Sequence, residues 1–142
     1  MSARGMIRKE AAESGQSFTE IAISLVFILI LLASIVDLGR IFFTFVALRD
    51  AAQEGAAYAS ICPNDTAGVE TRVRTSSNLP VNLLDTSNIL VEVFQDYVDI
   101  EVTVRVTHQD FSLSMPFLGG VTVPLRAVVT DSILTFTLTC PP

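Results

Sequence analysis

One stretch decides the fold: residues 15–60 read GQSFTEIAISLVFILILLASIVDLGRIFFTFVALRDAAQEGAAYAS. Its part from Ile21 to Val36 contains sixteen residues without a charge. As a helix these residues span roughly 24 Å, and their neighbours extend the length to the roughly 30 Å of a bilayer core. A buried core helix is the alternative, but the roughly 80 residues that follow are too few to cover it on every side. We therefore predict a membrane span over about residues 18–38.

The helix is predicted to continue beyond the membrane. Asp37 and Arg40 are three residues apart, so we expect them to pair on one helix face at the edge of the span. No proline occurs in the stretch before Pro63, which favours one helix over residues 16–61. Its later turns carry a row of small residues that would let another backbone approach closely, although alanines are also good helix formers in any setting. The row consists of Ala47, Ala51, Gly55 and Ala59.

Residues 1–15 form a polar leader in front of the apolar run, and they carry Arg4, Arg8 and Lys9. Basic residues before a membrane span predict that this end stays in the cytoplasm, so residues 62–142 are expected outside it. No small-residue cleavage site follows the apolar run. The span is therefore expected to be retained, unlike that of an ordinary signal peptide.

Glu20 is the only charged residue between Glu13 and Asp37. An unpaired carboxylate at the edge of a membrane span is energetically costly. One interpretation is a capping box, in which Ser17 and Glu20 satisfy the first amides of the helix. The other is cleavage between Gly15 and Gln16, which would create a positive amine close to Glu20 of the same chain or a neighbouring chain.

The leader that ends in glycine, the glutamate five residues later and the retained apolar helix resemble the type IV prepilin pattern. The wider stretch resembles the TadE-like proteins of the tight-adherence (Flp-type) pilus system. Asp37, Gly39, Arg40 and Phe42 carry this resemblance together with the Ala51–Ala59 segment, and it extends more weakly to residues 116–120 and 124–127.

The resemblance implies a minor pilin or pseudopilin that is cleaved by a prepilin peptidase and contacts other pilins through its N-terminal helix. The family's major pilins have a tyrosine after the conserved glutamate and lack a large globular domain. Here Ile21 follows Glu20 and a domain follows the helix, which favours a minor role over the main shaft.

Residues 62–142 are predicted to form a small α+β domain. Pro63 and Asn64 mark its start, and Asp65 or Thr66 is expected to cap a short helix over residues 67–77. Asn64 also begins a glycosylation sequon, the alternative use of this segment. Strands are predicted over residues 89–94 and within 121–139, the latter with a break near residues 130–132.

The clearest strand signal is a period-two alternation of apolar and polar residues, which indicates one buried and one solvated face. Its apolar members are Val98, Ile100, Val102, Val104 and Val106. The predicted sheet is antiparallel, has three or four strands and packs its apolar face against the helix.

Cys62 and Cys140 lie at the helix end and near the C-terminus. Outside the cytoplasm two such cysteines are expected to form a disulfide, with separate buried thiols as the alternative. They do not complete a metal site with the single, distant His108.

Two function classes remain. The chain has no recognisable nucleophile, phosphate-loop or metalloprotease motif, so neither enzyme activity nor a cofactor is expected. Its net charge of −6 argues against nucleic-acid binding. A pilus subunit or assembly factor and a monomeric, membrane-anchored binding module both fit the sequence, and both have membrane lipid as a partner.

Overall fold

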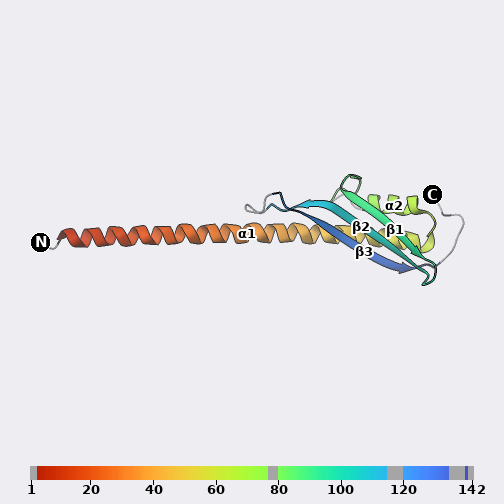
Figure 1. The fold of residues 1–142 in the computed structure, drawn as a ribbon, viewed down its shortest axis with the longest axis horizontal. Helices are drawn as coiled ribbons and strands as arrows, with labels where there is room; N and C mark the ends of the chain where they lie inside the picture. The colour runs from red at the N-terminus through yellow and green to blue at the C-terminus, as the bar shows by residue number, and fades with distance from the viewer. Residues whose placement is uncertain (1–2, 77–79, 115–119, 135–139, 141–142) are drawn as a thin grey trace.

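The computed structural model describes residues 3–76, 80–114, 120–134 and 140, and for residues 3–15 it describes the backbone alone. A single long helix projects from a small C-terminal domain (Figure 1). The elements are α1 (Ala3–Ile61), α2 (Thr66–Thr75), β1 (Ile89–Asp96), β2 (Glu101–Ser112) and β3 (Thr122–Ser132). This arrangement confirms the predicted α+β fold with a long N-terminal helix, a short helix and an antiparallel sheet.

The helix α1 begins earlier than predicted. It starts at Ala3, within the leader, because no proline interrupts residues 3–61 and many of them are good helix formers. Ser17 therefore lies inside a continuous helix, so the capping box of Ser17 and Glu20, one of the two interpretations, is not formed. Thr19 instead donates its hydroxyl to the carbonyl oxygen of Gln16 at 2.8 Å, a bond between neighbouring turns.

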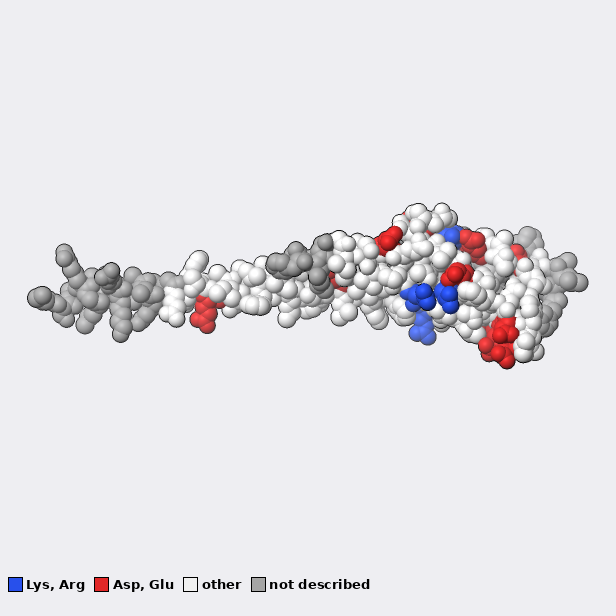
Figure 2. All heavy atoms as spheres, viewed as in Figure 1, with Lys and Arg blue, Asp and Glu red and all other residues white. Residues whose placement is uncertain are grey.

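The apolar half of α1 is not a core helix. Only 6% of its most apolar eighteen-residue window is buried, and the helix is long and apolar enough to cross a membrane. Figure 2 shows that this part of the helix carries little charge, whereas charged side chains gather over the globular part. The exposed large side chains include Ile21, Ile23, Leu25, Phe27, Ile28, Leu31, Leu32, Ile35, Val36 and Leu38.

The sheet has the order β1-β2-β3, and both pairs of neighbouring strands are antiparallel. In the central strand Val104 lies opposite Val93 on one side and opposite Val129 on the other. Val102, Val104 and Val106 are fully buried, as the alternation predicts. The sheet therefore presents its apolar face to the helices.

The alternating pattern overestimates the length of β2 at its start. Val98 and Ile100 lie in the turn between β1 and β2 and are 89% and 46% exposed. The Asp96 carboxylate accepts a hydrogen bond from the amide of Val98 at 2.9 Å, which favours a turn over a continued strand. Ile100 adopts a positive φ of 58°, a conformation that β-branched residues rarely take.

The remaining boundaries also shift. Phe111 belongs to β2, which extends to Ser112, and it is buried. The predicted break near residues 130–132 coincides with the end of β3 at Ser132, and residues 135–139 lie outside the described part. The second helix begins at Thr66, and its cap is Asp65, whose carboxylate accepts the amide of Gly68 at 2.9 Å.

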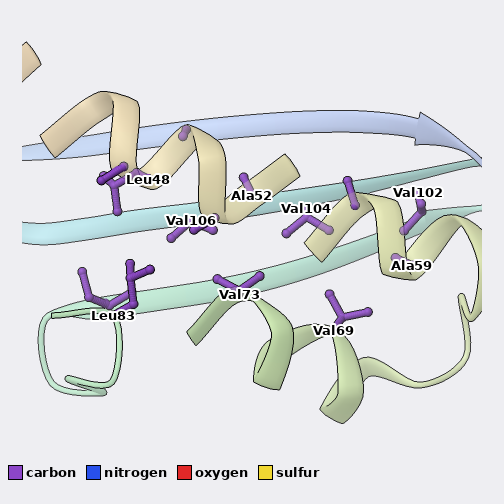
Figure 3. Packing of buried hydrophobic residues seen from close by; sticks show 14 of the residues in the cluster. Leu48, Ala52, Ala59, Val69, Val73, Leu83, Val102, Val104 and Val106 are labelled. Atoms are coloured by element: carbon purple, nitrogen blue, oxygen red, sulfur yellow. The ribbon is translucent and has the colours of Figure 1, made fainter. Parts of the chain in front are cut away.

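The core lies where both helices meet the same face of the sheet (Figure 3). Side chains from α1 and α2 surround the valines of β2, and Leu83 from the segment before β1 completes one end. The contribution of α1 is mostly alanine, so its backbone lies close to its neighbours. The labelled core residues are Leu48, Ala52, Ala59, Val69, Val73, Leu83, Val102, Val104 and Val106.

Candidate functional site

The row of small residues on α1 is buried against the chain's own domain. Ala47, Ala51 and Ala59 are at most 7% exposed. A Cβ atom at Gly55 would lie 2.5 Å from Cγ2 of Val73 and 3.3 Å from a methyl group of Val104. The close approach that the row predicts is therefore to α2 and β2 within the same chain. The buried Ala52 and Ala56 belong to the same contact, and four-residue spacing alone did not single them out.

Asp37 and Arg40 contact each other at the point where α1 leaves the domain. Their closest atoms, Oδ1 and Nη1, are 3.4 Å apart. Asp37 is 1% exposed, although nearly all the α1 side chains over residues 16–36 are exposed. It is covered because Ser114, beyond the end of β2, donates its backbone amide to Oδ2 of Asp37 at 2.9 Å.

Arg40 completes this cluster. Its Nη1 also donates to the hydroxyl of Ser114 at 2.5 Å, and its guanidinium lies 5.4 Å from the ring centre of Phe111. The sequence could not identify Ser114, which is 77 residues away from Asp37. We call Asp37, Arg40 and Ser114 the helix-exit cluster. It attaches the β2–β3 connection to the helix and neutralises a buried carboxylate beside the apolar segment.

Replacing Asp37 by alanine should release this attachment. Losing a charged acceptor leaves the amide of Ser114 unpaired, which costs about 2 kcal/mol. We expect hydrogen exchange of the Ser114 amide to rise about 30-fold, the equivalent of that energy. Asp37→Asn keeps an acceptor oxygen and should retain most of the protection. Unchanged exchange in Asp37→Ala would contradict the cluster, and exchange at β2 serves as the control because the core is distant from the change.

Glu20 lies on the exposed part of α1 and has no partner among the described residues. The chain is helical through Gly15 and Gln16, so these two residues are one continuous backbone in the intact protein. Glu20 and Arg40 are twenty residues apart, which corresponds to about 30 Å of helix and therefore to the thickness of a bilayer core. The two charged side chains thus bracket a segment of membrane length.

The far end of α1 is tied to α2 and to the C-terminus. Cys62 and Cys140 form a disulfide, with Cα atoms 5.8 Å apart. The Tyr58 hydroxyl donates to the Asp65 carboxylate at 2.8 Å, which raises the pKa of Tyr58. The pKa of Asp65 is lowered by the amide of Gly68 first and by Tyr58 second. These contacts fix the short loop between the helices.

His108, the single histidine, packs edge to face against Phe111 with ring centres 6.0 Å apart. Within the described ranges no three histidine, cysteine, aspartate or glutamate side chains are placed to hold a metal ion. The polar contacts of Asp37 and Asp65 attach segments of the chain to one another.

A membrane-length apolar helix that continues into a small α+β domain is a pilin-like fold. Residues 15–57 match the family model described as TadE-like protein. The resemblance to TadE-like proteins is thus confirmed over the N-terminal helix, from the glycine at the predicted cleavage point to the row of small residues. No curated protein and no solved structure matches the chain.

Proposed function

We propose that this protein is a minor pilin or pseudopilin of a Tad-type (Flp-type) pilus and acts in its assembly or structure rather than as an enzyme. The family match covers the helix that pilins use to contact one another. The apolar half of α1 lies outside the domain and exposes its side chains, so it is free to contact lipid first and other helices later. Adhesion or secretion by the completed pilus would be the biological outcome.

The proposed topology follows from the charges at the two ends of the span. The leader with its basic residues lies in the cytoplasm, α1 crosses the cytoplasmic membrane once, and the domain lies outside. The disulfide supports this orientation, because disulfides persist in oxidising compartments. A prepilin peptidase acting from the cytoplasmic side would cut between Gly15 and Gln16.

One observation carries the proposal: Glu20 is an exposed carboxylate on an otherwise apolar helix surface, and it has no partner in the described part of the chain. Cleavage after Gly15 would place the new amine of Gln16 four residues away, one helical turn from Glu20. Within an assembly the same amine of a neighbouring subunit would attract Glu20. A subunit at the wrong depth would leave the carboxylate unpaired in a low-dielectric setting, and such a position is disfavoured.

Replacing Glu20 by glutamine should leave membrane insertion and the outer domain intact but prevent assembly. A lost charged pair of about 1.5–3 kcal/mol lowers association by roughly 10- to 100-fold. We expect co-purification with other pilus subunits, and piliation measured by electron microscopy, to fall by that order. Blocking cleavage by changing Gly15, as verified by N-terminal mass spectrometry, should give the same defect because no amine forms.

Glu54→Gln is the matched control, since Glu54 is an exposed glutamate on the same helix but outside the apolar segment. It should assemble normally. Normal assembly of Glu20→Gln would favour the second function class, a membrane-anchored binding module that stays monomeric.

A further inference from the structure

A cleft of about 640 Å³ lies beside the helix-exit cluster. Three segments form its walls: α1 around Arg40 and Phe43, the residues before β1 around Asp85, and the end of β2 from His108 to Ser112. The volume falls within the range of small-molecule sites, roughly 300–1,000 Å³. Its walls combine apolar rings with charges of both signs.

The cleft lies at the height of the lipid headgroups in the proposed topology. If the bilayer core extends from Glu20 to Arg40, Phe43 lies about 4.5 Å farther along the helix axis. The headgroup layer on each side of a bilayer is about 5–7 Å thick. Phe42 and Phe43 are more than half exposed, as expected for aromatic residues at a membrane interface. A lipid can therefore reach the cleft without leaving the membrane.

One wall of the cleft is cationic. Arg40 is fixed by Asp37 and Ser114, but its side chain remains 46% exposed. Within the described residues only Nη1 of its guanidinium takes part in hydrogen bonds. Because arginine carries five N–H donors, the others are available to a phosphate group. The guanidinium also covers Phe111, so the aromatic face of that ring is already occupied by a cation.

The other two segments each contribute a carboxylate to the cleft, Asp85 before β1 and Asp110 near the end of β2. Asp85 accepts hydrogen bonds from the hydroxyl of Ser87 at 2.6 Å and from the side-chain amide of Asn88 at 2.8 Å. These bonds, with the Ser87 amide, lower the pKa of Asp85 to about 2, so its carboxylate is charged at neutral pH. Asp110 lines the same cleft, is exposed and has no partner among the described residues. A cleft with these two carboxylates favours a compact ammonium group.

We propose that this cleft binds the headgroup of a membrane phospholipid that carries a primary ammonium, the phosphoethanolamine headgroup. Arg40 binds the phosphate, Asp85 and Asp110 accept hydrogen bonds from the ammonium, and Phe43 contacts the apolar part of the lipid. A primary ammonium has three N–H donors for the two carboxylates. A trimethylammonium has none, and it is usually held by open aromatic faces.

This inference rests on the proposed membrane topology but not on pilus assembly. A bound headgroup would hold the domain at the membrane surface and fix the depth of α1. A subunit leaving the membrane would have to release it. The two proposals are tested separately, because lipid binding is measured on the isolated full-length chain and piliation is not.

The test uses the full-length chain in nanodiscs of phosphatidylcholine with phosphatidylethanolamine, or of phosphatidylcholine with phosphatidylglycerol. Native mass spectrometry should show at least 10-fold preferential retention of phosphatidylethanolamine. Hydrogen exchange in residues 80–89 should slow only when this lipid is present. Asp110→Asn should reduce the preference at least fivefold, and Asp99→Asn, an exposed carboxylate in the distal β1–β2 turn, should leave it unchanged.

Four outcomes would overturn the proposal. Equal retention of the two zwitterionic lipids would exclude recognition of the ammonium, and preference for phosphatidylglycerol would exclude a role for the carboxylates of Asp85 and Asp110. If 1 mM soluble phosphoethanolamine slows hydrogen exchange in residues 80–89 in nanodiscs of phosphatidylcholine alone, the ligand is not a lipid. If exchange in residues 80–89 slows without phosphatidylethanolamine, and only when the protein concentration is raised, the cleft binds a segment of another subunit.

Discussion

Gly55→Val should be among the most damaging single substitutions in the globular part of the chain and should lower its free energy of unfolding by about 3 kcal/mol. A Cβ atom at this position already meets Cγ2 of Val73 at 2.5 Å, and Val73 is fully buried. Valine adds two methyl groups to the same space and is a weaker helix former than alanine. Urea unfolding of the full-length chain in detergent, followed by tyrosine fluorescence, measures the effect because the chain lacks tryptophan.

Alanine at the same position separates the clash from helix propensity. Gly→Ala in a helix is worth about 1 kcal/mol of stability, and here overpacking of about 1–3 kcal/mol opposes it. We therefore expect a net loss of about 1 kcal/mol for Gly55→Ala. Gly39→Ala is the matched control on the same helix, since no atom lies within 4 Å of its Cβ position. It should not destabilise the domain.

A second substitution tests the contact itself. Val73→Ala should remove the methyl group that Gly55→Ala meets, so the double variant should be more stable than the sum of the two changes predicts. We expect a coupling energy of at least about 1 kcal/mol. Strict additivity would show that Gly55 is needed for another reason.

Removing the disulfide should have an effect of similar or larger size. Cys62 and Cys140 are 78 residues apart in sequence, and closing such a loop stabilises a fold by about 4 kcal/mol in the chain-entropy model. The double variant Cys62→Ala/Cys140→Ala avoids an unpaired buried thiol, because Cys62 is only 1% exposed. Its unfolding midpoint in urea should fall well below that of the parent chain.

The disulfide experiment has an internal comparison. Reducing the parent chain with dithiothreitol should bring its unfolding curve close to that of the double variant, and the variant itself should not respond to reductant. The backbone bond from the amide of Leu134 to the carbonyl of Ser60 also holds the chain beyond β3 against the end of α1. If that contact were sufficient, the double variant would unfold at the midpoint of the parent, which would contradict the prediction.

The sequence predicted the elements whose signals are local. The charge-free run identified the exposed apolar half of α1, and the alternation of valines identified the central strand. Asp65 was one of two candidates for the cap of α2. The wrongly predicted start of β2 also has a local cause. Val98 and Ile100 continue the alternation but lie in the turn, because the carboxylate of Asp96 stabilises a reversal of the chain that the hydrophobic pattern does not record.

By itself the sequence determined the class of fold, the membrane-length helix and the pairing of Asp37 with Arg40, because each depends on composition or on spacings within one element. Only the tertiary structure decided which residues cover Asp37 and Gly55. Ser114 binds Asp37, and Val73 occupies the space beside Gly55, although both residues are remote in the chain. A row of small residues specifies a close approach but not the partner. The partner is set by how the chain folds back on α1, where its own sheet and α2 bury the row before another subunit can.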